Sequence, residues 1–134
     1  MDSLNSLGSK KKVSQSAVVS VLYVLYFAPL AWVLYDYANY HMTAAGVVFG
    51  VTFAHFLAGL LENWGNVSEA ARDRYTGDQM WLNIVADFLI TASFLLSIVA
   101  LADTSEPRVL LAAAVIAVIG NTFCVAGRLA KGCI

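Results

Sequence analysis

Four long apolar stretches almost free of charged residues set what this chain can fold into. They run from Ser16 to Tyr35, from Thr43 to Leu61, from Met80 to Ala102 and from Val109 to Ala130. Each has about the length, roughly 20 residues, that an α-helix needs to cross a hydrocarbon core about 30 Å thick. Asp87 is the one acidic residue inside them. We therefore predict an all-α, polytopic membrane protein with four transmembrane helices in a compact bundle.

The composition agrees with lipid as the solvent. The chain has 134 residues, of which 60% are hydrophobic and 13% are charged, whereas soluble domains are nearer to half apolar and a quarter charged. A soluble domain this short has too little interior to hide so much apolar surface. The net charge is −1, and there is no stripe of basic residues interleaved with aromatic ones, so nucleic acid is not an expected partner. The lipid bilayer is the expected partner of the apolar stretches.

The positions of lysine and arginine predict the orientation. If the helices alternate in direction, seven of the eight basic residues lie on one side of the membrane, and Arg108 alone lies on the other. The positive-inside rule then places both termini in the cytosol. We expect a mobile cytosolic tail over residues 1–15, a transmembrane domain over 16–130 and a short cytosolic tail over 131–134. The seven residues are Lys10, Lys11, Lys12, Arg72, Arg74, Arg128 and Lys131.

Three short features of the sequence bear on its processing and modification. Asn66-Val67-Ser68 forms a glycosylation sequon, which a cytosolic loop leaves bare. The first stretch is longer than the apolar region of a cleaved signal peptide and has no small-residue cleavage site, so it is expected to remain as an anchor. Cys133 is misplaced for prenylation, and its palmitoylation stays an open alternative.

Small residues at four-residue spacing predict where helices pack. Residues four apart lie on one face of a helix, and small side chains let a second backbone approach closely. The second stretch carries four of them, so we expect its small-residue face to be the central packing surface. Serines of the third stretch and an asparagine of the fourth are expected to pack or hydrogen-bond between helices. The predicted packing residues are Gly46, Gly50, Ala54, Ala58, Ser93, Ser97 and Asn121.

The ionisable residues of the apolar stretches are candidates for function by default. Asp87 lies two turns into the third stretch, and its alternative role is a shallow carboxylate that reaches back to the headgroups. Asp36 fits a capping or loop position, and Glu62 a solvated helix end. His55 fits a hydrogen-bonded core residue better than a haem ligand, because His41, the other histidine, lies at a different depth. The sequence has no catalytic pair, metal cluster or phosphate loop, so we predict no enzymatic activity and no cofactor.

Several short segments agree in order and spacing with one family of small membrane proteins. They are Ala17-Val18-Val19-Ser20-Val21, Trp32 with Asp36, Thr76-Gly77 before Trp81-Leu82, Ser97, Gly120-Asn121 and Gly127-Arg128. In these features the chain resembles the transmembrane protein 50 / vacuolar protein sorting-associated protein 68 family over residues 17–128. Gln79 departs from the pattern, since the family has an arginine two residues before the third-helix tryptophan.

The resemblance implies a role in membrane traffic. Members of that family are four-helix proteins of endosomes, endoplasmic reticulum and Golgi, and the fungal member acts with a second small membrane protein in transport to the vacuole. Carried over, Trp32, Asp36, Trp81 and Asn121 become candidates for structural or partner contacts, and Asp87 is a further candidate polar contact. The expected function is thus helix–helix contact with another membrane protein in endosomal or secretory-pathway trafficking or in membrane-complex assembly.

Two other functions stay open. One is an accessory subunit that fills space in a larger membrane complex. The other is a small oligomeric transporter or channel with Asp87 and Asn121 in a polar path, because ionisable groups inside the membrane often mark such paths. A redox role would require a haem on His55.

Overall fold

Four apolar helices make up the part of the chain that the structure describes, which is residues 17–62, 75–103 and 106–130 of a computed structural model. The first span, Ala17–Asp36, comprises a helical segment over 17–25 and helix α2 (Phe27–Asp36). It is followed by α3 (His41–Glu62), α5 (Met80–Ala102) and α6 (Pro107–Ala130). All four spans are long and apolar enough to cross a membrane. The chain is accordingly an integral membrane protein.

The helix bounds follow local chemistry. Helix α3 starts at His41 rather than Thr43, and α6 starts at Pro107 rather than Val109; proline suits the first turn because the first amides of a helix have no partner within it. The first span is interrupted at Tyr26, three residues before Pro29. Proline cannot donate to the carbonyl four residues earlier, and the next bond, from the Leu30 amide to the Tyr26 carbonyl, is stretched to 3.5 Å.

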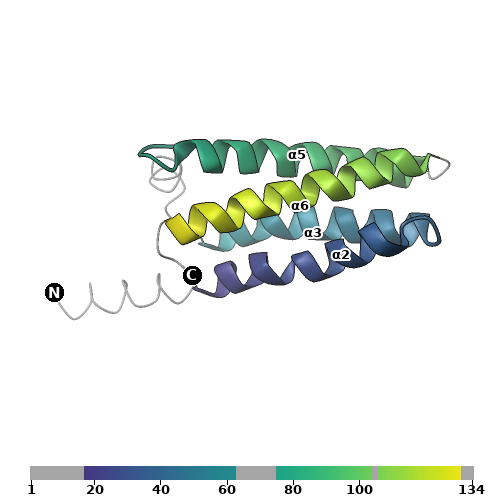
Figure 1. The fold of residues 1–134 in the computed structure, drawn as a ribbon, viewed down its shortest axis with the longest axis horizontal. Coiled ribbons are helices and arrows are strands. Elements are labelled where there is room, and N and C mark those ends of the chain that lie inside the picture. The colour runs from purple at the N-terminus through teal and green to yellow at the C-terminus, as the bar shows by residue number, and fades with distance from the viewer. Residues whose placement is uncertain (1–16, 63–74, 104–105, 131–134) are drawn as a thin grey trace.

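The helices lie side by side and alternate in direction (Figure 1). The start of the first span and the end of α6 lie at the same end, together with Glu62 and Met80, and we call this the polar end. The turn from Asp36 to His41 lies at the opposite end. Helices α5 and α6 make the most extensive contact of any pair. The phenylalanine at position 94 joins α5 to α3, with ring centroids 5.1 Å from Phe49 and 5.4 Å from Phe56.

The main apolar core lies toward the opposite end. It is built from small and branched side chains of the first span, α3, α5 and α6, which include Leu30, Val33, Ala44, Ala45, Val48, Val51, Ala100, Leu110, Ala113, Ala114 and Ala117. We call these residues the apolar core. A smaller cluster of Val19, Tyr23 and Ala58 lies nearer to the polar end. The alanines allow the helices to approach closely.

The closest helix contact uses glycines of α6 and not those of α3. A methyl group added at Gly120 would lie 3.0 Å from Ile90 Cδ1 and 3.1 Å from Leu89 Cβ, so α5 passes directly over this glycine. At Gly46 and Gly50, an added methyl group would meet no described atom within 4 Å. Both α3 glycines are exposed. Among the described residues, therefore, the part of α3 that carries Gly46 and Gly50 is not the central packing surface expected from the sequence.

Several expectations concern residues outside the described part of the chain. These are the two tails over 1–15 and 131–134, the sequon at Asn66 and the acylation of Cys133. The basic residues Lys10, Lys11, Lys12, Arg72, Arg74 and Lys131 also lie outside it.

Candidate functional site

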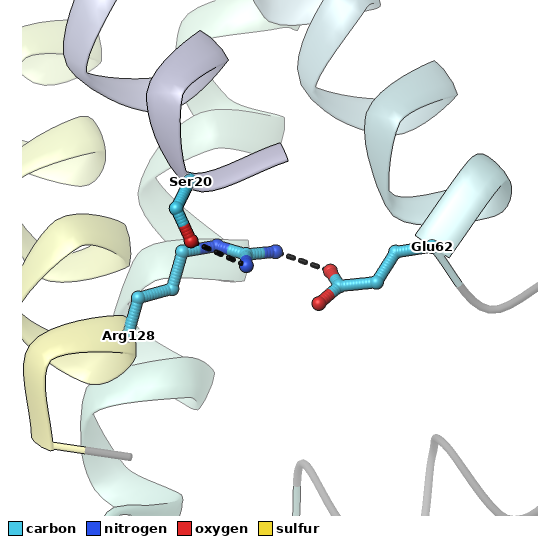
Figure 2. Close-up of polar contacts among 3 residues, drawn as sticks. All are labelled: Ser20, Glu62 and Arg128. Carbon is cyan, nitrogen blue, oxygen red and sulfur yellow. Dashed lines mark hydrogen bonds and ion pairs between the residues drawn. The ribbon is translucent and has the colours of Figure 1, made fainter. Parts of the chain in front are cut away.

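A buried arginine joins three helices at the polar end. Arg128 lies in the last turn of α6, and its side chain retains only 9% of its exposure. One guanidinium nitrogen, Nη1, donates to Ser20 Oγ at 3.1 Å, and Nη2 forms an ion pair with Glu62 Oε2. Figure 2 shows the guanidinium between Ser20 of the first span and Glu62 at the end of α3. One side chain thus connects the first span, α3 and α6.

Aromatic rings continue this arrangement away from the polar end. The Arg128 guanidinium carbon lies 4.6 Å from the centroid of the Tyr23 ring, within the range of a cation–π interaction. The Tyr23 ring stacks on the His55 imidazole at 4.7 Å, and Tyr26 contacts the same imidazole at 4.6 Å. The rings of Tyr23 and Tyr26 are themselves 5.8 Å apart in an edge-to-face arrangement. The three rings therefore form one triangular cluster in which each ring contacts the other two.

Asn121 ties the middle of α6 to the first span. Its side chain is fully buried, and Nδ2 donates to the Tyr23 carbonyl at 2.8 Å. The Tyr23 carbonyl lies three residues before the interruption of the first span at Tyr26. Near such an interruption, a neighbouring helix commonly supplies a hydrogen-bond donor to the backbone. We call Ser20, Tyr23, His55, Glu62, Asn121 and Arg128 the polar cluster.

The polar cluster is suited to binding and to holding helices together. Its two charges neutralise each other, which lowers the cost of placing them between helices. No group of three or more metal-ligating side chains occurs among the described residues. The cluster contains an ion pair, a hydroxyl, stacked rings and an amide, and these groups contact one another between the helices.

Most of the polar cluster is not evident from the sequence. Glu62 was expected to be solvated, but its side chain is only 22% exposed and it pairs with Arg128. His55 was expected to be a hydrogen-bonded core residue; it is buried and its side chain lies against that of Asn121. In the sequence, Arg128 contributes to the predicted orientation and to the family resemblance, but its ion pair is not evident. The position of Arg128 inside the end of an apolar stretch indicates a buried interaction, because a charge there needs a partner.

Asp87 and Asn121, the pair proposed for a polar path, have different partners in the structure. Asp87 is half-buried, and its Oδ2 accepts a hydrogen bond of 2.5 Å from the hydroxyl of Tyr75, which precedes α5. Asn121 binds the Tyr23 carbonyl in the first span. The carboxylate of Asp87 therefore tethers the segment before α5 to that helix.

The predicted contact residues near the ends of the helices lie on the surface. Asp36 Oδ1 accepts a hydrogen bond of 2.8 Å from Asn39 Nδ2 in the turn before α3. The Trp32 ring stacks on Tyr40 at 6.3 Å across the same turn. Trp81, at the start of α5, is 56% exposed and packs its edge against Phe123 of α6. These positions are accessible, and indoles there match the usual tryptophan belt at a membrane interface.

The remaining predicted packing residues divide between interior and surface. Ser93 is buried and donates from α5 to the Ala113 carbonyl of α6 at 2.8 Å, whereas buried Ser97 donates to Phe94 of its own helix at 2.6 Å. Ala58 is buried in the smaller apolar cluster. Ala54 is half-buried, and Gly46 and Gly50 face outward.

These features define an integral membrane protein of four apolar helices with a charge pair between them. No protein-family model, no curated protein and no solved structure matches the chain. The family resemblance therefore rests on the positions and spacing of the residues named above.

Proposed function

We propose that this chain is a non-enzymatic small integral membrane protein that acts through helix–helix contacts with another membrane protein. Its setting is endosomal or secretory-pathway trafficking, or the assembly of a membrane complex. The observation that carries the proposal is the outward face of α3, where Gly46 and Gly50 have open space beside them.

Glycine in a helix is costly when nothing requires it. A glycine is about 1 kcal/mol less favourable than alanine inside a helix, and within the described residues no contact requires either Gly46 or Gly50 to lack a side chain. Their spacing is that of the small-residue motif with which transmembrane helices approach each other closely. Phe53 and Leu57 continue the same face, 46% and 50% exposed. A helix of another protein fits this face.

The interior of the chain supports the same conclusion. The buried charges of Arg128 and Glu62 pair with each other, and the apolar core fills the space between the helices toward the opposite end. Because these groups satisfy each other inside the chain, the outer faces of the helices remain available for contact with another membrane protein. Trp81 and Trp32 are available for partner contacts at the two ends, since both are exposed.

The compartment and the orientation are part of the proposal. The distribution of basic residues supports cytosolic termini, and the polar end would then face the cytosol. The resemblance to the trafficking family supports a location in endosomes, endoplasmic reticulum or Golgi. In that family the fungal member works with one other small membrane protein, and we propose the same class of partner for this chain.

The test is co-purification in mild detergent with mass spectrometry, for the wild type and two matched variants. Gly50→Leu fills the open face of α3. Ala112→Leu adds similar bulk to an exposed position of α6, so it controls for size alone. We expect the wild type and Ala112→Leu to recover one small membrane protein with sorting components, and Gly50→Leu to lose it. Equal recovery by both variants would remove α3 from the interface.

Two other results would replace the proposal. Recovery of a large enzyme complex at fixed stoichiometry would identify an accessory subunit. Recovery of the chain alone as a discrete homo-oligomer would favour transport, and flux measurements on Asp87→Asn would then decide.

A further inference from the structure

One place in the first span has weak helical bonding, and it separates residues 17–25 from helix α2. Pro29 has no amide hydrogen, so it donates nothing to the Leu25 carbonyl four residues earlier. The next bond, from the Leu30 amide to the Tyr26 carbonyl, has a length of 3.5 Å, whereas the bond that the Tyr26 amide donates has a length of 3.0 Å. Helices bend where such bonds are lost. We call residues 17–25 the amino-terminal segment and Tyr26 the joint.

Helix α2, on one side of the joint, is fixed by packing and by its connection to α3. Leu30 and Val33 are fully buried in the apolar core. The turn after α2 leads directly into α3, and Asn39 Nδ2 donates to Asp36 Oδ1 at 2.8 Å across it. A displacement of α2 would therefore disturb both the apolar core and this turn.

The amino-terminal segment, on the other side of the joint, depends on polar contacts with α6. Arg128 Nη1 donates to Ser20 Oγ at 3.1 Å, and Asn121 Nδ2 donates to the Tyr23 carbonyl at 2.8 Å. The Arg128 guanidinium also lies over the Tyr23 ring. The buried apolar side chains of the segment are those of Val19 and Tyr23. Apolar side chains gain little by leaving lipid for a neighbouring helix, so the polar contacts dominate the attachment of this segment.

We propose that the amino-terminal segment moves as a unit about the joint, away from α3 and α6, and that Arg128 and Asn121 hold it in the closed position of the structure. Helix α2 stays in place during this movement. The open position uncovers Arg128, Asn121 and His55 on the sides of α6 and α3 that faced the segment. Polar groups uncovered at membrane depth are costly, so the closed position is the resting one. The movement leaves the outer face of α3, on which the proposed function rests, unchanged.

A modest bend at the joint displaces the far end of the segment by a measurable distance. Residues 17–25 form nine residues of helix, which are about 13 Å long at about 1.5 Å per residue. A bend of about 20°, the lower limit of a sharp kink, moves Ala17 by about 5 Å. A probe near Ala17 therefore reports the movement, whereas a probe on α2 does not.

Distances between paired spin labels on the full chain in lipid bilayers test the movement, and double electron–electron resonance measures them. The two native cysteines are replaced by alanine in every sample, so that labels attach only at the chosen positions. These cysteines are Cys124 and Cys133.

Two label pairs report the two ends of the first span. The polar-end pair, Val18→Cys with Leu61→Cys, reports the amino-terminal segment against α3. The opposite-end pair, Tyr35→Cys with Arg108→Cys, reports α2 against α6. All four positions are exposed, so the labels leave the packing between helices intact.

Two variants that remove different polar contacts should release the segment. Arg128→Met and Asn121→Ala should each add a second population to the polar-end distances, displaced by about 5 Å, and leave the opposite-end distances unchanged. Thr122→Val is the control on α6 and should change neither pair, because the Thr122 hydroxyl bonds to the Val118 carbonyl of its own helix at 2.8 Å. Either release variant decides alone if the other does not fold.

A further substitution tests the position of the joint. Addition of Pro29→Ala to Arg128→Met supplies the absent donor for the Leu25 carbonyl and should reduce the second population. Its undiminished persistence would overturn the joint at Tyr26. Polar-end distances that stay unchanged in a folded release variant overturn the proposal, as do equal changes at both label pairs, because the first span would then move as one rigid helix.

Discussion

Replacement of Arg128 by methionine should destabilise the helix arrangement more than any other single change near the polar end. Methionine keeps much of the aliphatic stem but removes the guanidinium. The variant loses the hydrogen bond to Ser20, the contact with the Tyr23 ring and the ion pair with Glu62. These contacts hold α6 against the first span and α3, so the loss should appear in the stability of the whole domain.

The magnitude follows from the three contacts. A hydrogen bond from a charged donor contributes about 1.5 kcal/mol, and a cation–π contact contributes about 1 kcal/mol. The ion pair adds about 1 kcal/mol, a value discounted because Glu62 stays partly exposed and is screened by solvent. The free energy of unfolding should therefore fall by about 3 kcal/mol, allowing for incomplete additivity.

The assay is reversible unfolding in mixed micelles of mild detergent and dodecyl sulfate, followed by circular dichroism. Arg108→Met is the matched control, because Arg108 is exposed at the start of the same helix and exposed substitutions usually change stability by less than about 0.5 kcal/mol. Glu62→Gln and the double variant complete a mutant cycle, with an expected coupling of about 1 kcal/mol. An Arg128→Met protein no less stable than Arg108→Met would refute the role given to Arg128.

Three further predictions use matched pairs in the same assay. Gly120→Ala should lower the free energy of unfolding by about 1–3 kcal/mol, because the added methyl group would meet Ile90 and Leu89. Gly50→Ala should leave it unchanged or raise it by up to about 1 kcal/mol. Equal effects of the two variants would contradict the close contact between α5 and α6. Ser93→Ala should cost about 0.6 kcal/mol by loss of the bond to α6, and Ser97→Ala, whose bond lies within α5, should cost less; the reverse order would count against the interhelical bond. Tyr75→Phe and Asp87→Asn should each cost less than about 1 kcal/mol with non-additive effects in the double variant; full additivity would show that the pair does not interact.

The apolar stretches carried most of the information about the fold. Apolar composition and length predict a transmembrane helix almost alone, because a helix is the simplest way to satisfy the backbone inside lipid. The third stretch accordingly ends where α5 ends, at Ala102. The starts of α3 and α6 differ because Pro107 and His41 extend their helices beyond the apolar residues.

The arrangement of the helices could not be read in the same way. Small residues at four-residue spacing occur on α3 and on α6, and sequence alone does not say which face turns inward. The structure places Gly120 against α5 and leaves Gly50 open. The pairing of Arg128 with Glu62 joins residues 66 positions apart, and only the packing of three helices brings them together. Asn121 was predictable as a contact between helices, since a buried amide needs a partner, but its partner was not.

Photocrosslinking in native membranes can show whether the outer face of α3 contacts another membrane protein. A photoreactive amino acid is placed at Phe53, on the exposed face of α3 beside Gly50, and separately at Val115, an exposed position of α6. We expect a discrete adduct with one membrane protein from position 53, lost when Gly50→Leu is added, and no such adduct from position 115. Absence of an adduct at position 53, or the same adduct from both positions, would contradict that contact.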